Sequence, residues 1–444
     1  MSRKYFGTDG VRGKVGTDPM TADFAMRLAS AAAQVLVPEG GRVLIGKDTR
    51  LSGYMFESAL EAGFVAAGVD VLLLGPLPTP AIAMLTQQHE ADLGVVISAS
   101  HNSYEDNGIK FFDGKGSKLS DDVEQQIEEH LAKPAITRES GELGKARRID
   151  SAGIDYQQFA ASTFPAEESL DGLKVVFDGA NGAGYKVGPK TLSHLGAEVI
   201  PISCSPNGRN INDGCGSTHT ELLQMTVPAV KADVGVALDG DGDRVVMADE
   251  NGALIDGDQM LYILAKAQHE RGALTGPVVG TVMSNLGLEH ALHAAGIEFK
   301  RAKVGDRYVL EELRLSGGNI GGETSGHMLV LDQTTTGDGL VCALQLLAIM
   351  KRTGKKLSEL AAGMAKYPQT MVNVRTTERF DPTDSVVIQN AVSAAETELA
   401  DTGRVVLRAS GTEPLIRVMV EGEDREQVVA LAERLAAVVA DATS

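Results

Sequence analysis

Val234-Gly-Val-Ala-Leu-Asp-Gly-Asp-Gly-Asp-Arg-Val-Val-Met-Ala-Asp249 places a turn of alternating aspartate and glycine directly after a short apolar run. Such a run, bounded by turn residues, is typical of a buried strand in an α/β domain. The glycines let Asp239, Asp241 and Asp243 turn their carboxylates toward one hard cation, and carboxylate oxygens favour Mg²⁺ or Mn²⁺ over zinc. A solvated acidic turn is the alternative, but three like charges repel unless they are neutralised. The stretch therefore predicts a metal loop at the end of a strand.

The same alternation of short β-rich runs and amphipathic stretches continues on both sides of this loop. Strands are expected to begin at Arg42, Val69 and Leu93, near Leu173, and at Val278 and Phe299. Helices are expected over residues 54–67, 80–89, 256–270 and 340–364. Because the pattern restarts three times, it predicts three similar α/β domains with mixed or parallel sheets.

The last eighty or so residues have a different pattern. Strand-like runs begin at Gln369, Gly403 and Leu415, and residues 424–442 have one apolar helical face. This predicts a smaller α+β C-terminal domain. We therefore expect four domains around a central cleft, over residues 1–152, 153–253, 254–366 and 367–444.

Composition restricts the class of protein. The 444 residues carry a formal net charge of −19, which would repel nucleic acid and acidic membranes, so we expect neither as a partner. The chain has no apolar run of about 18 residues and no signal-peptide core at its start. Its three cysteines lack CxxC spacing, which suits a reducing compartment and excludes a cysteine metal site. A cytoplasmic protein is expected.

A second segment, Ile97-Ser-Ala-Ser-His-Asn-Ser103, also follows an apolar strand. A serine in a loop of small residues at a strand end is exposed enough to act as a nucleophile or phosphate carrier, and Ser100 is the candidate. The GxSxG pattern of hydrolases is absent. His101 is a candidate base for Ser100, although adjacent residues rarely align for this, and a hydrogen bond that orders the loop is the other interpretation.

Two further segments suit polar ligands, the first a sugar and the second a phosphate; the alternatives are a polar turn between strands for the first and a surface ion pair for the second. Gly321-Gly-Glu-Thr-Ser-Gly-His327 mixes a carboxylate, hydroxyls and an imidazole, as sugar hydroxyls require, and Lys303 and Arg307 nearby add positive charge. Arg408-Ala-Ser-Gly-Thr-Glu-Pro414, with Arg417 after it, combines backbone amides, hydroxyls and arginines in a phosphate cradle. No GK[ST] follows, so this is not a Walker loop.

These four segments, together with Phe6-Gly-Thr-Asp-Gly-Val-Arg-Gly13, resemble the α-D-phosphohexomutase family over essentially the whole chain. Their form is closest to the bacterial members that act on glucosamine phosphates, with departures at Ser103 and Thr324, where proline and glutamine are usual. The resemblance implies the four-domain phosphohexomutase architecture, with one loop from each domain in the cleft. It implies an isomerase that interconverts glucosamine 6-phosphate and glucosamine 1-phosphate for amino-sugar nucleotide and cell-wall precursor synthesis.

The resemblance also assigns roles to the residues that match. It implies a phosphoserine at Ser100, with Mg²⁺ held by Asp239, Asp241, Asp243 and the phosphorylated Ser100, and a hexosamine 1,6-bisphosphate as intermediate or primer. The residues expected beside the phosphoserine are Arg12, Lys110, His101 and Arg244. Those expected to bind the phosphosugar are Lys303, Arg307, Glu323, Ser325, His327, Arg408, Ser410, Gly411, Thr412 and Arg417.

Several questions stay open at this stage. Lys110 is the first candidate and His327 the second for the group that removes the hydroxyl proton. Because basic residues gather in the predicted loops, we expect a positive cleft inside a negative exterior. A phosphomannomutase or phosphoglucomutase, a non-catalytic sugar-phosphate sensor and a Mg²⁺-dependent phosphatase are the competing functions. A homodimer is possible.

Overall fold

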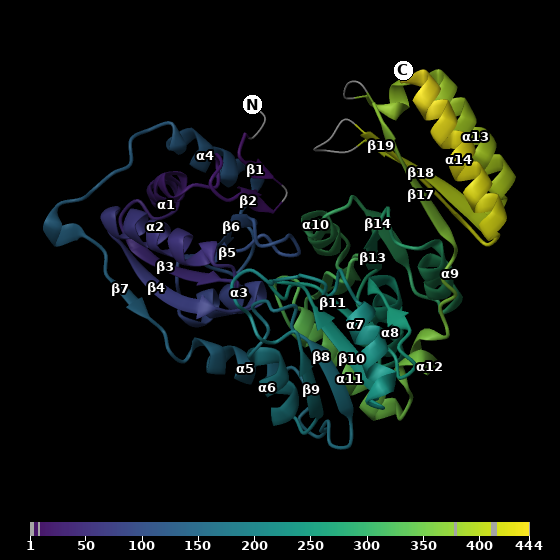
Figure 1. The fold of residues 1–444 in the computed structure, drawn as a ribbon, viewed down its shortest axis with the longest axis horizontal. Coiled ribbons are helices and arrows are strands. Elements are labelled where there is room, and N and C mark those ends of the chain that lie inside the picture. Colours follow the sequence, from purple (N-terminus) through teal and green to yellow (C-terminus); the bar gives the residue numbers. More distant parts are fainter. Residues whose placement is uncertain (1–3, 8, 377–379, 410–414, 444) are drawn as a thin grey trace.

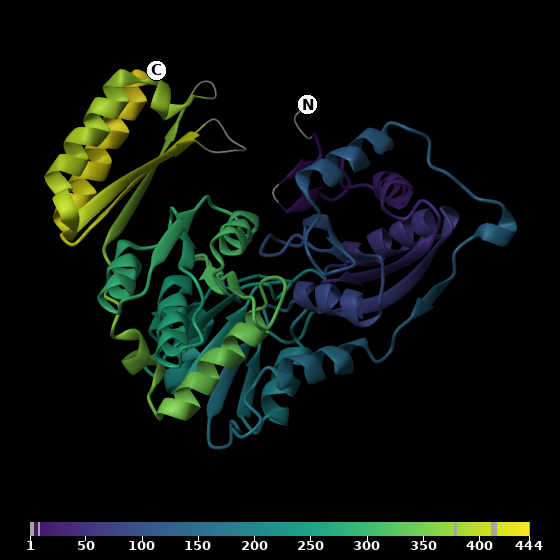
Figure 2. The same ribbon diagram turned by 180° about the vertical axis from the view of Figure 1, so that it is seen from behind.

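The computed structural model describes residues 4–7, 9–376, 380–409 and 415–443. They form four domains, each built on its own sheet. In Figures 1 and 2 the first domain and the last stand apart, and the two middle domains join them. The predicted fold, three α/β domains with mixed sheets and a smaller α+β domain, is confirmed. No helix of the described residues has both the length and the apolarity needed to cross a membrane.

The first domain contains a seven-stranded mixed sheet in the order β1-β2-β6-β5-β3-β4-β7. Its strands are β1 (Phe6–Gly7), β2 (Gly10–Lys14), β3 (Gly41–Lys47), β4 (Val69–Pro76), β5 (Leu93–Ile97), β6 (Asp106–Asp113) and β7 (Ala146–Arg148). Its helices are α1 (Ala22–Leu36), α2 (Ser52–Ala66), α3 (Thr79–Gln88) and α4 (Asp121–Leu131), followed by a 3-10 turn at Ser140–Glu142. Phe24, Phe56 and Phe64 are fully buried in the core between α1, α2 and the sheet.

The second domain has a five-stranded sheet in the order β12-β11-β10-β8-β9. Its strands are β8 (Lys174–Asp178), β9 (Glu198–Ile202), β10 (Val234–Leu238), β11 (Val245–Ala248) and β12 (Leu254–Ile255), and its helices are α5 (Ala152–Ser162), α6 (Val187–His194) and α7 (Glu221–Ala229). Because β12 pairs with β11, Leu254 and Ile255 belong to this sheet and not to the third domain, where the sequence placed them.

The third domain has the strand order β14-β13-β15-β16. Its strands are β13 (Val278–Thr281), β14 (Phe299–Ala302), β15 (Ile320–Gly322) and β16 (Met328–Val330). Its helices are α8 (Gly257–Glu270), α9 (Leu286–Ala294), α10 (Asp306–Ser316), α11 (Gly339–Thr353) and α12 (Leu357–Ala361). The single helix expected over residues 340–364 is wrong, because Gly354 ends α11 in the left-handed conformation, with φ of 66°.

The C-terminal domain is a three-stranded antiparallel sheet with two helices on one face, as Figures 1 and 2 show. Its strands are β17 (Gln369–Arg375), β18 (Gly403–Ala409) and β19 (Leu415–Gly422). Its helices are α13 (Val386–Leu399) and α14 (Arg425–Ala442), with 3-10 turns at Pro382–Asp384 and Ala400–Thr402. Val428, Leu431, Leu435 and Val439, the apolar face predicted for the last helix, are buried in a core of their own.

Candidate active site

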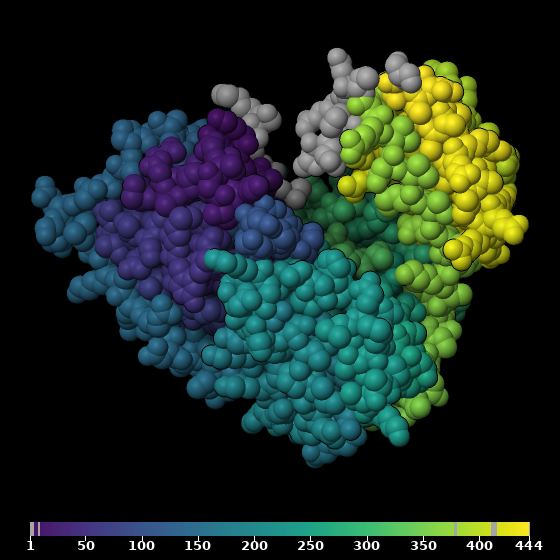
Figure 3. Space-filling model, in the orientation of Figure 1, coloured from purple at the N-terminus to yellow at the C-terminus, as the bar shows by residue number. Residues whose placement is uncertain are grey.

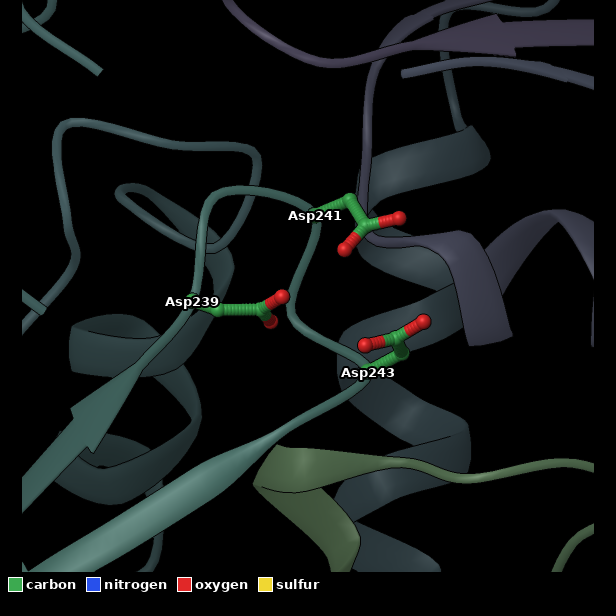
Figure 4. Close-up of side chains that lie close together, drawn as sticks. All are labelled: Asp239, Asp241 and Asp243. Carbon is green, nitrogen blue, oxygen red and sulfur yellow. The ribbon is translucent and has the colours of Figure 1, made fainter. Parts of the chain in front are cut away.

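The acidic loop is the turn of the antiparallel hairpin β10–β11. Asp239, Asp241 and Asp243 are all buried, and one carboxylate oxygen of each lies within 4.8 Å of the others. Figure 4 shows the three carboxylates pointing into one space. One oxygen of Asp241 and one of Asp243 are buried without a hydrogen-bond partner among the described residues. Three converging carboxylates with oxygens that accept no hydrogen bond are ligands of the kind that Mg²⁺ takes, so this donor set fits Mg²⁺.

Ser100 lies in the loop after β5, in the first domain, and its Oγ donates a hydrogen bond of 2.6 Å to Asp239 Oδ2 in the second. The serine is buried and has a left-handed backbone, with φ of 52°. Burial, together with Asp243 and Asp241 beside it, raises the pKa of Asp239 well above its usual range. The hydroxyl and the acidic loop, 139 residues apart in the sequence, are therefore in direct contact.

Lys110 of β6 is buried among carboxylates from two domains. Its Nζ lies 2.9 Å from Asp241 Oδ2, 2.9 Å from Asp9 Oδ2 and 3.5 Å from Asp243 Oδ2. Burial opposes the charge of the lysine, but these carboxylates outweigh it and raise the pKa of Lys110. In this arrangement the ammonium is therefore protonated and acts as a fixed positive charge, and its role as proton acceptor stays a prediction.

His101 and two arginines surround the serine. His101 Nδ1 lies 3.4 Å from Ser100 Oγ and 3.1 Å from Arg244 Nη1. Burial, followed by the charges of Arg244 and Arg12, lowers the pKa of His101 to about 4, so its imidazole is neutral at physiological pH. Arg12 of β2 pairs with Asp9. Both interpretations of His101, as a base and as a residue that orders the loop, fit this geometry.

The sugar-recognition segment reaches the same space from the third domain. His327 is buried, with Nδ1 3.6 Å from Asp243 Oδ1 and Nε2 3.3 Å from Asp306 Oδ2. Burial opposes its charge, but Asp306 and Asp243 raise the pKa of His327 to about 9. His327 is therefore protonated at neutral pH in this arrangement, and its role as second candidate for the proton acceptor stays a prediction. Glu323 accepts a hydrogen bond of 2.9 Å from the Gly305 amide.

The first and third domains are linked by Asp9, Lys118 and Asp306, which were not predicted as site residues. Lys118 Nζ lies 2.6 Å from Asp9 Oδ1 and 2.6 Å from Asp306 Oδ2. Asp9 lies within the Phe6–Gly13 motif, and Asp306 directly precedes Arg307, which was predicted to bind the phosphosugar. The sequence therefore offered a signal for both aspartates. Lys118 has no such signal, because its two partners come from distant parts of the chain.

Arg307 does not line the cleft as expected. Its guanidinium donates to Glu124 at 3.0 Å and to the Leu119 carbonyl at 3.1 Å, and it also pairs with Asp121. These partners lie on α4 of the first domain and just before it, so Arg307 joins two domains. Lys303 is exposed and contacts the ring of Tyr308, 5.7 Å from its centroid, and it is not among the residues lining the cleft.

The cleft has a volume of about 570 Å³, within the range of small-ligand sites. Figure 3 shows the hollow between the first domain and the C-terminal domain. The positively charged side chains lining it are those of Arg12, Lys118, Arg244, Arg408 and the protonated His327, and the negatively charged ones are those of Asp9, Asp243, Asp306 and Glu323. The described lining therefore carries a small positive excess, to which a bound divalent cation would add, and the positive cleft stays a prediction.

The structure describes only part of the predicted phosphate cradle at residues 408–414. Arg408 lies in the cleft lining and is directly opposite Arg417 in the pairing of β18 with β19. Burial and the charge of Arg417 lower the pKa of Arg408, as expected for two like charges directly opposite each other on neighbouring strands. Ser410, Gly411 and Thr412 lie outside the described residues. Ser325 is exposed at the tip of its loop.

Comparison with known proteins agrees with this geometry. Four models of phosphoglucomutase/phosphomannomutase match in order: alpha/beta/alpha domain I over residues 3–137, domain II over 155–252, domain III over 256–367 and the C-terminal domain over 371–438. A crystal structure of a phosphoglucomutase/phosphomannomutase family protein from Burkholderia thailandensis has a TM-score of 0.82 at 23% identity, over 98% of this chain and 97% of that one.

The chain therefore belongs to the phosphoglucomutase/phosphomannomutase family. It is an enzyme of the isomerase class, which transfers phosphate between positions on a small phosphosugar. The family is Mg²⁺-dependent, and Asp239, Asp241 and Asp243 are the residues of this chain that fit the ion.

Two of the similar proteins have names that specify an amino sugar. The chain is 57% identical over 436 residues to a protein of Photorhabdus laumondii named phosphoglucosamine mutase, covering 98% of each chain. An N-acetylphosphoglucosamine mutase of Aspergillus fumigatus, solved with GlcNAc-6P and magnesium, has a TM-score of 0.70 at 18% identity and covers 99% of this chain and 96% of that one.

Proposed function

We propose that this enzyme is a phosphoglucosamine mutase, which interconverts glucosamine 6-phosphate and glucosamine 1-phosphate through a phosphoserine at Ser100. The observation that carries the proposal is the 2.6 Å contact between Ser100 Oγ and Asp239, which brings a buried hydroxyl to a cluster of carboxylates fit for a cation. The name of the 57% identical relative supports glucosamine as the sugar.

In the proposed cycle the phosphoserine donates its phosphoryl group to the free hydroxyl of the bound monophosphate. The bond from phosphorus to Ser100 Oγ breaks, a bond from phosphorus to the sugar oxygen forms, and the proton of the sugar hydroxyl ends on Ser100 Oγ, which leaves as the serine hydroxyl. The resulting glucosamine 1,6-bisphosphate turns over in the cleft and returns its other phosphoryl group to Ser100. A Mg²⁺ ion held by the three aspartates would neutralise charge on the transferring group.

The cations of the first two domains are proposed to neutralise this charge as well. Lys110 is fixed between Asp9 and Asp241, and Arg12 and Arg244 line the cleft beside His101. Phosphoryl transfer needs positioning and charge stabilisation more than covalent chemistry, so fixed cations suit it. We propose that neutral His101 orders the serine loop, because its Nδ1 faces both Ser100 and Arg244.

The other two domains are proposed to hold the substrate. Glu323, Ser325 and His327 bind sugar hydroxyls, with Lys303 at the edge of this loop. Arg408 and Arg417 bind the distal phosphate, together with the residues at 410–412. Two arginines directly opposite each other on neighbouring strands gain most when an anion lies between them, and such a site can hold either phosphate of the bisphosphate.

The substrate test compares glucosamine, glucose and mannose phosphates side by side, with release of inorganic phosphate measured in parallel. The proposal predicts the highest kcat/KM for glucosamine phosphates and little free phosphate. A preference for mannose or glucose would make the enzyme a phosphomannomutase or phosphoglucomutase. Release of phosphate without isomerisation would indicate a phosphatase, and binding without turnover a sensor.

Two further expectations belong with this proposal. A cytoplasmic location fits an enzyme whose product enters amino-sugar nucleotide and cell-wall precursor synthesis. A homodimer stays a prediction, and light scattering at several protein concentrations would test it.

A further inference from the structure

Two carbonyl oxygens of the serine loop are each held by the same pair of side chains. The Ser100 carbonyl accepts a hydrogen bond of 3.2 Å from Arg50 Nη2 and one of 2.9 Å from Asn212 Nδ2. The Asn102 carbonyl accepts from the same two groups, at 2.5 Å and 3.0 Å. Arg50 belongs to the first domain and Asn212 to the second, so the loop is clamped from both sides of the domain boundary.

The first-domain half of this clamp is rigid. Arg50 is fully buried and paired with Asp48, whose Oδ2 also accepts a hydrogen bond of 2.5 Å from Ser98 Oγ. Ser98 Oγ in turn accepts a hydrogen bond of 2.9 Å from the Ser100 amide. This half is therefore complete within the first domain and does not depend on the second.

The second-domain half depends on a close approach of two loops. Asn212 has a left-handed φ of 57°, and its backbone N–H donates a hydrogen bond of 2.9 Å to the Ala180 carbonyl. A Cβ at Gly240, in the acidic loop, would lie 2.6 Å from the Ser100 carbonyl and 2.7 Å from Asn212 Nδ2. The glycine after Asp239 is therefore required for Asn212 and the serine loop to meet.

Ser100 also needs such support. Its φ of 52° is one that residues other than glycine rarely adopt, and surrounding contacts must hold it there. This backbone conformation aims Oγ at Asp239.

We propose that Asn212 is a positioning residue, which makes the orientation of Ser100 depend on the docking of the second domain. The inference rests on the proposed phosphoserine function and deepens it: phosphoryl transfer to Ser100 is fast only when Asn212 holds the carbonyl oxygens of Ser100 and Asn102. Arg50 alone leaves the loop attached to the first domain but not aligned with the acidic loop.

The test uses full-length Asn212→Gly and Asn212→Asp. Glycine tolerates the left-handed backbone but lacks the donor, and ionised aspartate keeps the shape but repels the two carbonyl oxygens. Rapid-quench phosphorylation by glucose 1,6-bisphosphate, followed by intact mass, gives the rate constant and its dependence on bisphosphate concentration. Both variants are expected to phosphorylate about 100-fold more slowly, with half-saturation changed less than about threefold.

Thr49→Val is the matched control. Thr49 Oγ1 donates a hydrogen bond of 2.5 Å to the Asn181 carbonyl across the same domain boundary without touching the serine loop. We expect the control to phosphorylate at nearly the wild-type rate. Wild-type rates in both Asn212 variants would overturn the inference, as would an equal loss of rate in Thr49→Val at an equal loss of thermal stability.

Hydrogen exchange separates this inference from the proposed function. The amides of residues 98–103 are expected to exchange at least about tenfold faster in Asn212→Gly than in the wild type, whether or not bisphosphate is present. Unchanged exchange would overturn the positioning role. If the wild type takes up no phosphate at Ser100, the proposed function fails, while the exchange rates still decide whether Asn212 clamps the loop.

Discussion

Asp338 gives a prediction that is independent of the reacting groups. The carboxylate is buried at the start of α11, where it accepts a hydrogen bond of 3.0 Å from the Val341 backbone amide. The Tyr156 hydroxyl of α5 lies 3.0 Å from each of its two oxygens and donates to them. Burial raises the pKa of Asp338 from 3.8 to about 6. We propose the substitution Asp338→Asn, which keeps the shape and stays neutral at every pH.

The magnitude follows from linkage between proton binding and folding. The folded protein binds this proton more tightly than the unfolded chain, so the stabilisation is complete below pH 3.8 and is lost as the pH rises through about 6. Two pKa units correspond to about 3 kcal/mol. Asp338→Asn should therefore be more stable than the wild type above the folded pKa by up to this amount, or by about 3 °C in Tm for a chain of 444 residues.

Thermal unfolding followed by circular dichroism at about pH 5 and about pH 8 measures the effect. The variant should gain about twice as much Tm over the wild type at the higher pH as at the lower, because about pH 5 lies between the unfolded pKa of 3.8 and the folded pKa of about 6, where roughly half of the difference is already present. Asp150→Asn is the control, because it removes the same charge from an exposed side chain and should shift Tm equally little at both pH values. A variant that is less stable than the wild type at about pH 8, or whose gain is the same at both, would refute the reasoning.

Three other predictions concern the site and its supports. Arg307→Ala should lower stability by about 2 to 3 kcal/mol, because the hydrogen bonds of its guanidinium to Glu124 and the Leu119 carbonyl are lost at the boundary between two domains, while KM changes less than about threefold. The reverse pattern would restore Arg307 as a substrate ligand. Thr79→Val removes the hydrogen bond of 2.7 Å from Thr79 Oγ1 to Asp241. It should raise the Mg²⁺ concentration that gives half-maximal thermal stabilisation about tenfold. An unchanged dependence of thermal stability on Mg²⁺ would contradict this supporting role of Thr79. Gly240→Ala should lower kcat by about 100-fold, since its Cβ would displace the Ser100 carbonyl, and a near-normal kcat would show that the two loops can separate without cost.

Local sequence patterns predicted most of the fold, because strands and helices depend largely on periodicity within a few residues. The helix 54–67 and the strand beginning at Val69 correspond to α2 and β4 within two residues. The continuous helix over 340–364 failed because the apolar periodicity passes across Gly354, where the backbone turns left-handed. A glycine inside such a pattern was the signal that the chain ended one helix and began another.

The site was predictable where several chemical groups share one short segment, as in the acidic loop and around Ser100. Residues whose role comes from partners in another domain were not. Lys118 meets Asp9 and Asp306 only in the folded chain, and Arg307 turns toward α4 instead of the cleft. The protonation of Lys110 was missed for the same reason, since two of the carboxylates that hold its proton come from the second domain.

The central claim is that Ser100 stores the phosphoryl group beside the acidic loop. The most direct measurement is the intact mass of the protein after incubation with hexose 1,6-bisphosphate and Mg²⁺, with the modified residue located by peptide mass spectrometry, for the wild type and for Ser100→Ala. The account predicts one added phosphoryl group on Ser100 of the wild type, its loss to added glucosamine monophosphate, and none on the variant. Equal phosphorylation of Ser100→Ala, or a wild type that isomerises glucosamine phosphates without ever carrying phosphate at Ser100, would contradict it.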